Sequence, residues 1–324
     1  MQYSRFAIDE SPFCVWEWDL QERNLAFINS IDPTYFEYLA NVHAQAFEMD
    51  EHKQRAALSL RTAYAHGLET FFALLFATIQ APDCVIGWVH KYEVKNLRNL
   101  IRKVETGRPI LSKLRIEPIN WESLSNTILF ELSLEDKAKE NRIKEHFATA
   151  WARFAHDYVH EKSNQEYNSI KHGFRASAGG FRAASGKEEK YGVPAPAERM
   201  RSRGGSDFGS SFFIPEMIGV QKLHFRVKRY SINWRPERFL YGLHIISFSL
   251  QNILSFLKVV NGVDARTVQF SWPSDESRFE ELRRPIGGVI EVGLDTIIRP
   301  EHIKLFTKQE ILDIYKEDDH HDSH

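Results

Sequence analysis

Hydrophobic residues recur at intervals of three and four along most of the chain, which is the spacing of an amphipathic helix. The clearest example is the segment 51–80, which ends at Ala81 because a residue before proline disfavours the helical conformation. The same spacing and its end signals predict further helices over 32–47, 84–105, 134–161, 164–176, 236–260, 276–284 and 307–315. The pattern therefore predicts a mainly helical fold.

Alternation of apolar and polar residues marks a few shorter segments instead. In 223–232 the residues Leu223, Phe225 and Val227 share one face, which predicts a half-buried strand. Shorter strands are predicted within 13–31, 267–272 and 289–294. Residues 178–211 are rich in Gly, Ser and Pro and show no such pattern, so we expect a long, mobile loop there.

The segment 240–260 is apolar over almost its whole length and is long enough to span a membrane. It also contains His244, Asn252 and Lys258, and polar groups are costly in hydrocarbon, so we expect a buried core helix. The side chains expected to be buried are Ile246, Leu250, Ile253, Leu254 and Leu257. The N-terminus lacks the pattern of a secretory signal, so we expect a cytoplasmic protein without a membrane partner.

Composition restricts the function classes further. The chain of 324 residues has a formal net charge of −2, which excludes a uniformly basic nucleic-acid-binding protein but not a local basic patch. Its two cysteines, Cys14 and Cys84, exclude a disulfide framework and suit a reducing compartment.

Common catalytic motifs are absent from the sequence. It contains no GxGxxG, Walker A, GxSxG or HExxH motif, which argues against dinucleotide enzymes, P-loop NTPases, α/β-hydrolases and zincins. His156 and His160 have the spacing of a metal-binding pair on a helix, but no third ligand is evident. We therefore expect neither a metal nor a cofactor.

The helix predicted after Ser163 carries the most informative polar face. Ser163 and Glu166 match a capping box, in which each side chain bonds a backbone amide of the first turn. Positions spaced by three and four then share one face, and they are Asn168, Lys171, His172 and Arg175. An amide, two cations and an imidazole near a helix N-terminus suit a phosphate-bearing ligand, with His172 as general acid or base. The alternative is an ordinary polar face on a surface helix.

A second polar group interrupts the apolar helix predicted over 51–80. It consists of Arg61, Tyr64, His66 and Glu69. Ionisable side chains in so apolar a segment are costly unless they are paired, either with one another or with the polar face of the later helix. The pattern indicates either buried ion pairs or a site, and in the second case Glu69 and His172 are expected to meet in one polar pocket.

The Gly-rich segment has a charge pattern of its own. Between Lys171 and Arg203 there are eight basic residues and three acidic ones, a local charge of +5. Aromatic residues, Phe174, Phe181 and Tyr191, lie among them. Flexible arms with arginine and aromatic side chains suit single-stranded nucleic acid, through phosphate neutralisation and base stacking. The alternative is a solvated loop with scattered charge.

Together these features resemble the HEPN superfamily, the higher eukaryote and prokaryote nucleotide-binding domains. The resemblance rests on RTAYAHGLETFFALL at 61–75, on YNSIKHG at 167–173 and on the long apolar helix that follows. The family's motif is an arginine, usually followed by a polar residue such as asparagine, with a histidine after four to six intervening residues. Asn168 and His172 match the amide and the histidine, and Tyr167 stands in the arginine's place. The spacing also fits two other pairs, Arg61 with His66 and Arg153 with His160.

The resemblance implies a domain organisation. A HEPN-like helical bundle is expected over 51–262, with a Gly-rich loop and β insertion at 178–235. An N-terminal segment of strands and a helix (1–50) precedes it, and a small mixed lobe (263–318) and a disordered tail (319–324) follow.

The resemblance also implies an activity. HEPN proteins are commonly dimers, and many are metal-independent ribonucleases in toxin and antiviral-defence systems, so the expected partners are RNA or a nucleotide and a second copy of the chain. His172 is then expected to take the proton from a ribose 2′-hydroxyl, Asn168 to orient the phosphate, and Lys171 and Arg175 to stabilise the charge that develops on it. Glu69, if it reaches this pocket, is expected to hold Lys171, Arg175 or His172 in place. Substrate contacts are expected from Arg175, Arg61, Arg182 and Tyr167. The alternative is a non-catalytic module for dimerisation or nucleotide sensing.

Overall fold

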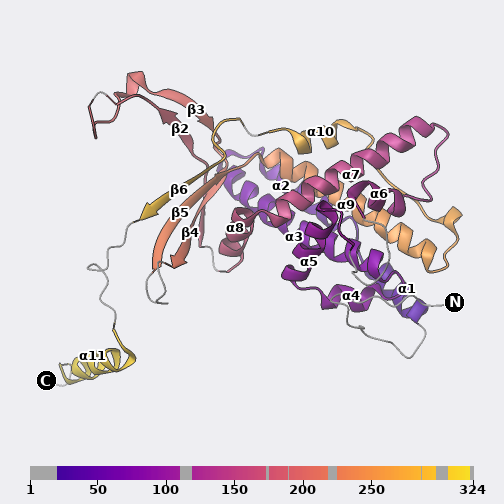
Figure 1. The fold of residues 1–324 in the computed structure, drawn as a ribbon, viewed down its shortest axis with the longest axis horizontal. Helices are drawn as coiled ribbons and strands as arrows, with labels where there is room; N and C mark the ends of the chain where they lie inside the picture. Colours follow the sequence, from indigo (N-terminus) through magenta and orange to yellow (C-terminus); the bar gives the residue numbers. More distant parts are fainter. Residues whose placement is uncertain are drawn as a thin grey trace.

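The computed structural model describes residues 20–109, 119–172, 175–188, 190–217, 225–285, 287–296 and 306–321. Within them, helices form the main body and a small antiparallel sheet lies at one side of it (Figure 1). The prediction of a mainly helical fold is confirmed.

Two long helices form the centre of the body. They are α3 (Lys53–Gln80) and α9 (Pro236–Val260), which pack against each other and against α2 (Tyr35–Ala46). The five α9 side chains predicted to be buried are at most 3% exposed. Burying one aliphatic side chain of this size contributes about 1.5–3 kcal/mol, so this stripe is a major source of stability.

By length and composition alone, α9 is apolar enough to cross a membrane. However, 67% of its most apolar 18-residue stretch is buried inside the protein. The helix is therefore mostly buried in the core, as its polar residues predicted.

Further helices cover this pair. Leu20–Ser30 forms the helix α1, so the prediction of strands there was wrong, and 13–19 lie outside the described residues. The helix predicted over 84–105 divides into α4 (Val85–Lys91) and α5 (Val94–Glu105), because Glu93 and Asn96 form a capping box that starts a second helix. A short helix that was not predicted, α6 (Trp121–Ile128), begins at Asn120, whose side chain accepts a hydrogen bond from the Ser123 amide.

The junction of α7 (Lys137–Val159) and α8 (Glu161–Lys171) differs from the prediction. His160, not Ser163, caps α8: its Nδ1 atom accepts a hydrogen bond from the Ser163 amide at 3.3 Å. The helix ends at Lys171 rather than near residue 176. Glu166 is free of the capping role predicted for it, because its carboxylate points into the protein and binds other partners there.

Strands occupy much of the segment that was predicted to be a loop. In the four-stranded sheet, β1 (Ala176–Ala178) pairs with β4 (Gly209–Met217), β4 with β5 (Phe225–Asn233), and β5 with β6 (Glu291–Thr296), all antiparallel. A separate hairpin pairs β2 (Arg182–Ser185) with β3 (Arg201–Gly205). The prediction for 178–211 was wrong because these strands consist mainly of Ala, Ser, Gly and Arg, which give no hydrophobic alternation while their backbones still pair.

The segment after α9 holds the remaining elements, among them α10 (Ser277–Arg283) and α11 (Lys308–His321). No strand forms over 267–272, all of which are described: side chains of α9, Asn252 and Ser255, bond that backbone instead. The capping box of Thr307 and Glu310 that begins α11 is confirmed. The helix continues to His321, beyond the predicted end, and 322–324 lie outside the described residues. Short 3-10 turns cover Asp50–His52, Ala197–Arg199 and Ala265–Thr267.

Candidate functional site

A cavity of about 450 Å³ opens where α3, α7 and α8 meet the end of β5, the start of α9 and the segment after α10. Its wall is rich in positive charge. Six arginines line it: Arg61, Arg153, Arg235, Arg238, Arg283 and Arg284. Three carboxylates line it as well: Asp157, Glu166 and Glu291. The excess of guanidinium groups favours an anionic ligand.

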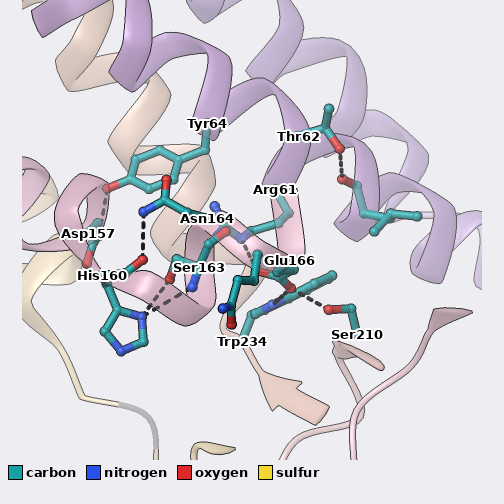
Figure 2. Close-up of polar contacts among 12 residues, drawn as sticks. Arg61, Thr62, Tyr64, Asp157, His160, Ser163, Asn164, Glu166, Ser210 and Trp234 are labelled. Carbon is teal, nitrogen blue, oxygen red and sulfur yellow. Dashed lines mark hydrogen bonds and ion pairs between the residues drawn. The ribbon is translucent and has the colours of Figure 1, made fainter. Parts of the chain in front are cut away.

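Glu166 is the centre of the inner wall (Figure 2). Its carboxylate is 1% exposed; one oxygen accepts a hydrogen bond from Arg61 Nε at 2.8 Å. The other oxygen accepts hydrogen bonds from Trp234 Nε1 at 2.8 Å and from the Ser210 hydroxyl. Arg61 also donates to the Ser163 carbonyl at 3.2 Å and lies over the Phe239 ring.

This network joins four elements. Arg61 comes from α3, Glu166 from α8 and Ser210 from β4, while Trp234 directly follows β5. A buried ion pair persists only where further hydrogen bonds satisfy both charges, and here the bonds come from the sheet. The pair therefore fixes α8 between the helical body and the sheet, and it sets the shape of the cavity wall.

A second carboxylate, Asp157, whose side chain is 13% exposed, lies on α7. It accepts a hydrogen bond from the Tyr64 hydroxyl at 2.8 Å and forms an ion pair with Arg238. The Nε atom of Arg153 lies 3.4 Å from the carboxylate. Burial opposes its ionisation, but the hydrogen bond from His156 and the guanidinium groups of Arg238 and Arg153 hold the pKa of Asp157 well below its usual range. Burial, and then the charge of Asp157, raises the pKa of Tyr64, so Tyr64 remains a donor.

Two histidines of the α7–α8 junction also line the cavity. The rings of His156 and His160 stack, with centroids 6.2 Å apart. His156 is exposed, and its Nδ1 atom lies 3.5 Å from the Asp157 carboxylate. Because an ionised Asp157 favours a proton on that nitrogen, the Nε2 atom of His156 is left with a free lone pair. In His160 the Nδ1 atom accepts a bond from Ser163, so its proton is assigned to Nε2.

Tight helix packing supports this wall. A Cβ atom at Gly242 of α9 would lie 2.6 Å from the ring of Tyr64, which is closer than real Cβ contacts occur. Glycine therefore lets α9 approach α3 closely enough to hold Tyr64 against Asp157.

The predicted site residues lie in four places. Arg61 is in the cavity wall. Glu69 lies beside Tyr167 on α8: burial, and next the charge of Glu69, raises the pKa of Tyr167 to about 12. Arg182 forms a two-pronged ion pair with Asp207 near the base of the β2–β3 hairpin.

The rest are on the outer face of α8 and just beyond it, and all are exposed: Asn168, Lys171, His172 and Arg175. Lys171 lies over the Tyr167 ring at 5.6 Å. Glu69 therefore approaches the helix that carries His172, but among the described residues no hydrogen bond or ion pair joins the two side chains.

Several residues of the cavity were not predicted. They are Asp157, Trp234, Arg235, Arg238, Arg283 and Arg284. The sequence signals that pointed here were Arg61 within an apolar helix, the spacing of His156 and His160, and the spacing of Arg153 and His160, which brackets Asp157. In the part of the chain that the structure describes, no group of three or more His, Cys, Asp or Glu side chains is arranged to hold a metal ion.

Comparison with known proteins adds no relative. No protein family, curated protein or solved structure matches this chain.

Proposed function

We propose that the arginine-lined cavity binds RNA and cleaves it without a metal ion, as a HEPN-like ribonuclease. The observation that carries the proposal is His156, an exposed imidazole held by the Asp157 carboxylate at the edge of a surface with an excess of guanidinium groups. A general base beside an anion-binding surface is what phosphodiester cleavage requires.

The cavity suits one nucleotide and its phosphate. Ligand pockets typically measure about 300–1,000 Å³, and this one lies in that range. Arg283 is exposed and forms no ion pair with a described residue, so it is available for a phosphate. Phe239 and Trp234 give the wall an apolar part that a base could contact.

The reaction follows from the roles of these groups. The Nε2 atom of His156 takes the proton of a ribose 2′-hydroxyl, and the 2′-oxygen attacks the adjacent phosphorus. The bond from phosphorus to the 5′-oxygen breaks, and the leaving oxygen takes a proton from water. The His160 Nε2–H group and Arg283 stabilise the charge that develops on the phosphoryl oxygens. The products carry a 2′,3′-cyclic phosphate and a 5′-hydroxyl.

Cleavage of single-stranded RNA in EDTA by the wild type and by His156→Ala tests the proposal. The variant is expected to lower kcat by about 10²–10⁴-fold, the usual contribution of a general base. His90→Ala, which removes another exposed histidine outside the cavity, is the matched control and is expected to leave kcat unchanged. Equal rates in His156→Ala and the wild type, or loss of all activity in EDTA, would contradict the proposal.

A non-catalytic role is the second candidate, either nucleotide sensing or dimerisation. One observation favours it: the pairs of Glu166 with Arg61 and of Asp157 with Arg238 are complete without a ligand, as in a purely structural network. If the protein senses a nucleotide, titration calorimetry is expected to show nucleotide binding that Arg283→Gln weakens. Neither the wild type nor any variant is then expected to cleave RNA. Light scattering measures whether the chain forms the proposed homodimer.

A further inference from the structure

The β2–β3 hairpin stands apart from the four-stranded sheet. We call the residues 182–205 the arm; Figure 1 shows its two strands extending away from the helical body. Its sequence contains six basic residues and three acidic ones. The described chain therefore has a second positively charged region, which the proposed reaction does not use.

One surface of the arm collects this charge. An open recess of about 720 Å³ is lined by Lys187, Arg201 and Arg203, together with Arg199 and Glu188. Arg201 and Arg203 both line this recess, and Arg203 is the extra residue of a bulge, because the register of the hairpin shifts between Ala183 and Ala184. Arg203 Nε donates a hydrogen bond to the Ser185 hydroxyl at 2.6 Å, which holds the guanidinium across the hairpin.

Three cations of this face, Lys187, Arg201 and Arg203, are available to a ligand. Lys187 and Arg201 are exposed, and neither they nor Arg203 form an ion pair with any described residue. The Glu188 carboxylate accepts a bond from the Gly192 amide at 3.4 Å and does not pair with them. Two guanidinium groups and an ammonium group in one open recess offer separate contacts to the phosphates of one extended strand.

An aromatic ring lies at the far end of the arm. Tyr191 is fully exposed, at 102% of the reference area, and follows the recess along the chain. Aromatic rings are rarely left so exposed, because most of their surface is apolar. An exposed ring on the arm that carries the basic face provides the stacking surface that unpaired bases use.

The base of the arm is fastened to the cavity. The Asn233 side chain, which lines the cavity, accepts a bond from the Phe181 amide and donates to the Phe181 and Val289 carbonyls. Backbone contact adds to this, because a Cβ atom at Gly204 would lie 2.9 Å from Gly288. Gly288 is four residues after Arg284, which lines the cavity, and Gly204 is next to Arg203 of the basic face. The contact between the two glycines therefore joins the arm to the segment that lines the cavity.

We propose that the arm binds single-stranded RNA, with Arg201 and Arg203 on its phosphates and Tyr191 stacked on a base, and leads the strand to the cavity. The choice of RNA rests on the proposed function, whereas the preference for a single strand rests on Tyr191, since paired bases present no free face. The arm thereby sets which strand reaches His156.

Fluorescence anisotropy of the full chain with a labelled single-stranded RNA tests this inference. The RNA carries 2′-O-methyl groups, which block attack by the 2′-oxygen and so separate binding from cleavage. Arg201→Gln with Arg203→Gln is expected to weaken binding about tenfold or more and to lower the slope of log K against log salt by about 1.4, or 0.7 for each lost contact. Lys95→Gln with Arg102→Gln, the same charge change on exposed residues of α5, is expected to leave both quantities unchanged.

The stacking role has its own pair of variants. Tyr191→Ala is expected to weaken binding of the single strand about fivefold or more and to leave binding of the same RNA as a duplex unchanged. Tyr191→Phe keeps the ring and is expected to bind like the wild type. An unchanged salt slope in the double arginine variant, or equal binding by Tyr191→Ala and the wild type, would overturn the inference.

Cleavage of unmodified RNA is measured separately. If binding depends on the arm as described but the wild type cleaves no RNA, the proposed function fails and the arm remains an RNA-binding element. If cleavage occurs and binding does not depend on the arm, this inference fails and the proposed function stands.

Discussion

The inward and outward faces of α8 both carry polar or ionisable side chains, but those on the inward face are buried and those on the outward face are exposed to solvent. On the inward face, Glu166 is almost completely buried and three donors bond its carboxylate. The outward residues are exposed, and they are Asn168, Lys171 and His172. The inward charge therefore holds the fold together, while the outward charges are free to meet solvent or a ligand.

The difference shows what a local pattern can reveal. Helical spacing predicts that Asn168 and Lys171 share a face of α8, and both are exposed, whereas His172 and Arg175 lie beyond the end of the helix at Lys171. The partners of Glu166 are 44, 68 and 105 residues away in the sequence, so no local pattern indicates that this glutamate is buried. A capping box was the local interpretation of a residue whose role is set by distant elements.

The largest expected effect is at the inward face. Glu166→Gln keeps the shape of the side chain but leaves Arg61 buried without its counter-charge. The expected cost is about 3–5 kcal/mol in the free energy of unfolding, the usual result of breaking a buried ion pair. Urea denaturation followed by circular dichroism measures it.

Glu161→Gln is the matched control, since Glu161 is an exposed carboxylate on the same helix. Its loss is expected to cost at most about 1 kcal/mol, through the helix dipole. Equal costs at the two positions would show that the two faces of α8 do not differ in the way described.

The next largest effect is expected at Gly242 of α9, which lies behind the cavity wall that the inward face of α8 helps to form. Gly242→Ala places a methyl group 2.6 Å from the Tyr64 ring, so α9 must move away from α3. Overpacking of this kind costs about 1–3 kcal/mol and lowers Tm in thermal unfolding. At Gly287 an added Cβ meets nothing within 4 Å, so Gly287→Ala is expected to leave Tm nearly unchanged. A similar Tm for both variants would contradict the close packing of Tyr64.

A smaller, pH-dependent effect belongs to Asp157. Its pKa is held well below the usual value in the folded protein, so the stabilisation is complete above the unfolded pKa of about 3.9 and is lost as the pH falls toward the folded value. Between pH 5 and 2 the wild type is expected to lose stability more steeply than Asp157→Asn in denaturant titrations. Asp264→Asn removes an exposed carboxylate paired with Arg266 and is expected to change this slope little. Parallel curves for Asp157→Asn and the wild type would refute the role of Asp157.

Much of the fold follows from the sequence, and the exceptions have physical causes. The boundaries of α3 and α9 are predictable because each is a long apolar stripe with proline or Asn-Gly at its end. The hairpin and β1 are not, because Arg, Ala, Ser and Gly mark no buried face. In the cavity, Arg61 could be singled out as a charge within an apolar helix. The roles of Asp157 and Trp234 could not be predicted, because their partners come from elements that are distant in the sequence.

The smallest expected effect is at the outward face of α8, and it separates two locations for the proposed chemistry. Lys171→Ala and His172→Ala change exposed side chains, so each is expected to alter the free energy of unfolding by no more than about 0.5 kcal/mol. If the cavity is the site, both variants cleave RNA at the wild-type rate while His156→Ala does not. If the outward face is the site, as the match of Asn168 and His172 to the HEPN motif implies, His172→Ala lowers kcat by about 10²–10⁴-fold with the fold intact. Because His172→Ala leaves the fold intact in either case, its cleavage rate beside that of His156→Ala decides which face of the α7–α8 region carries the reaction.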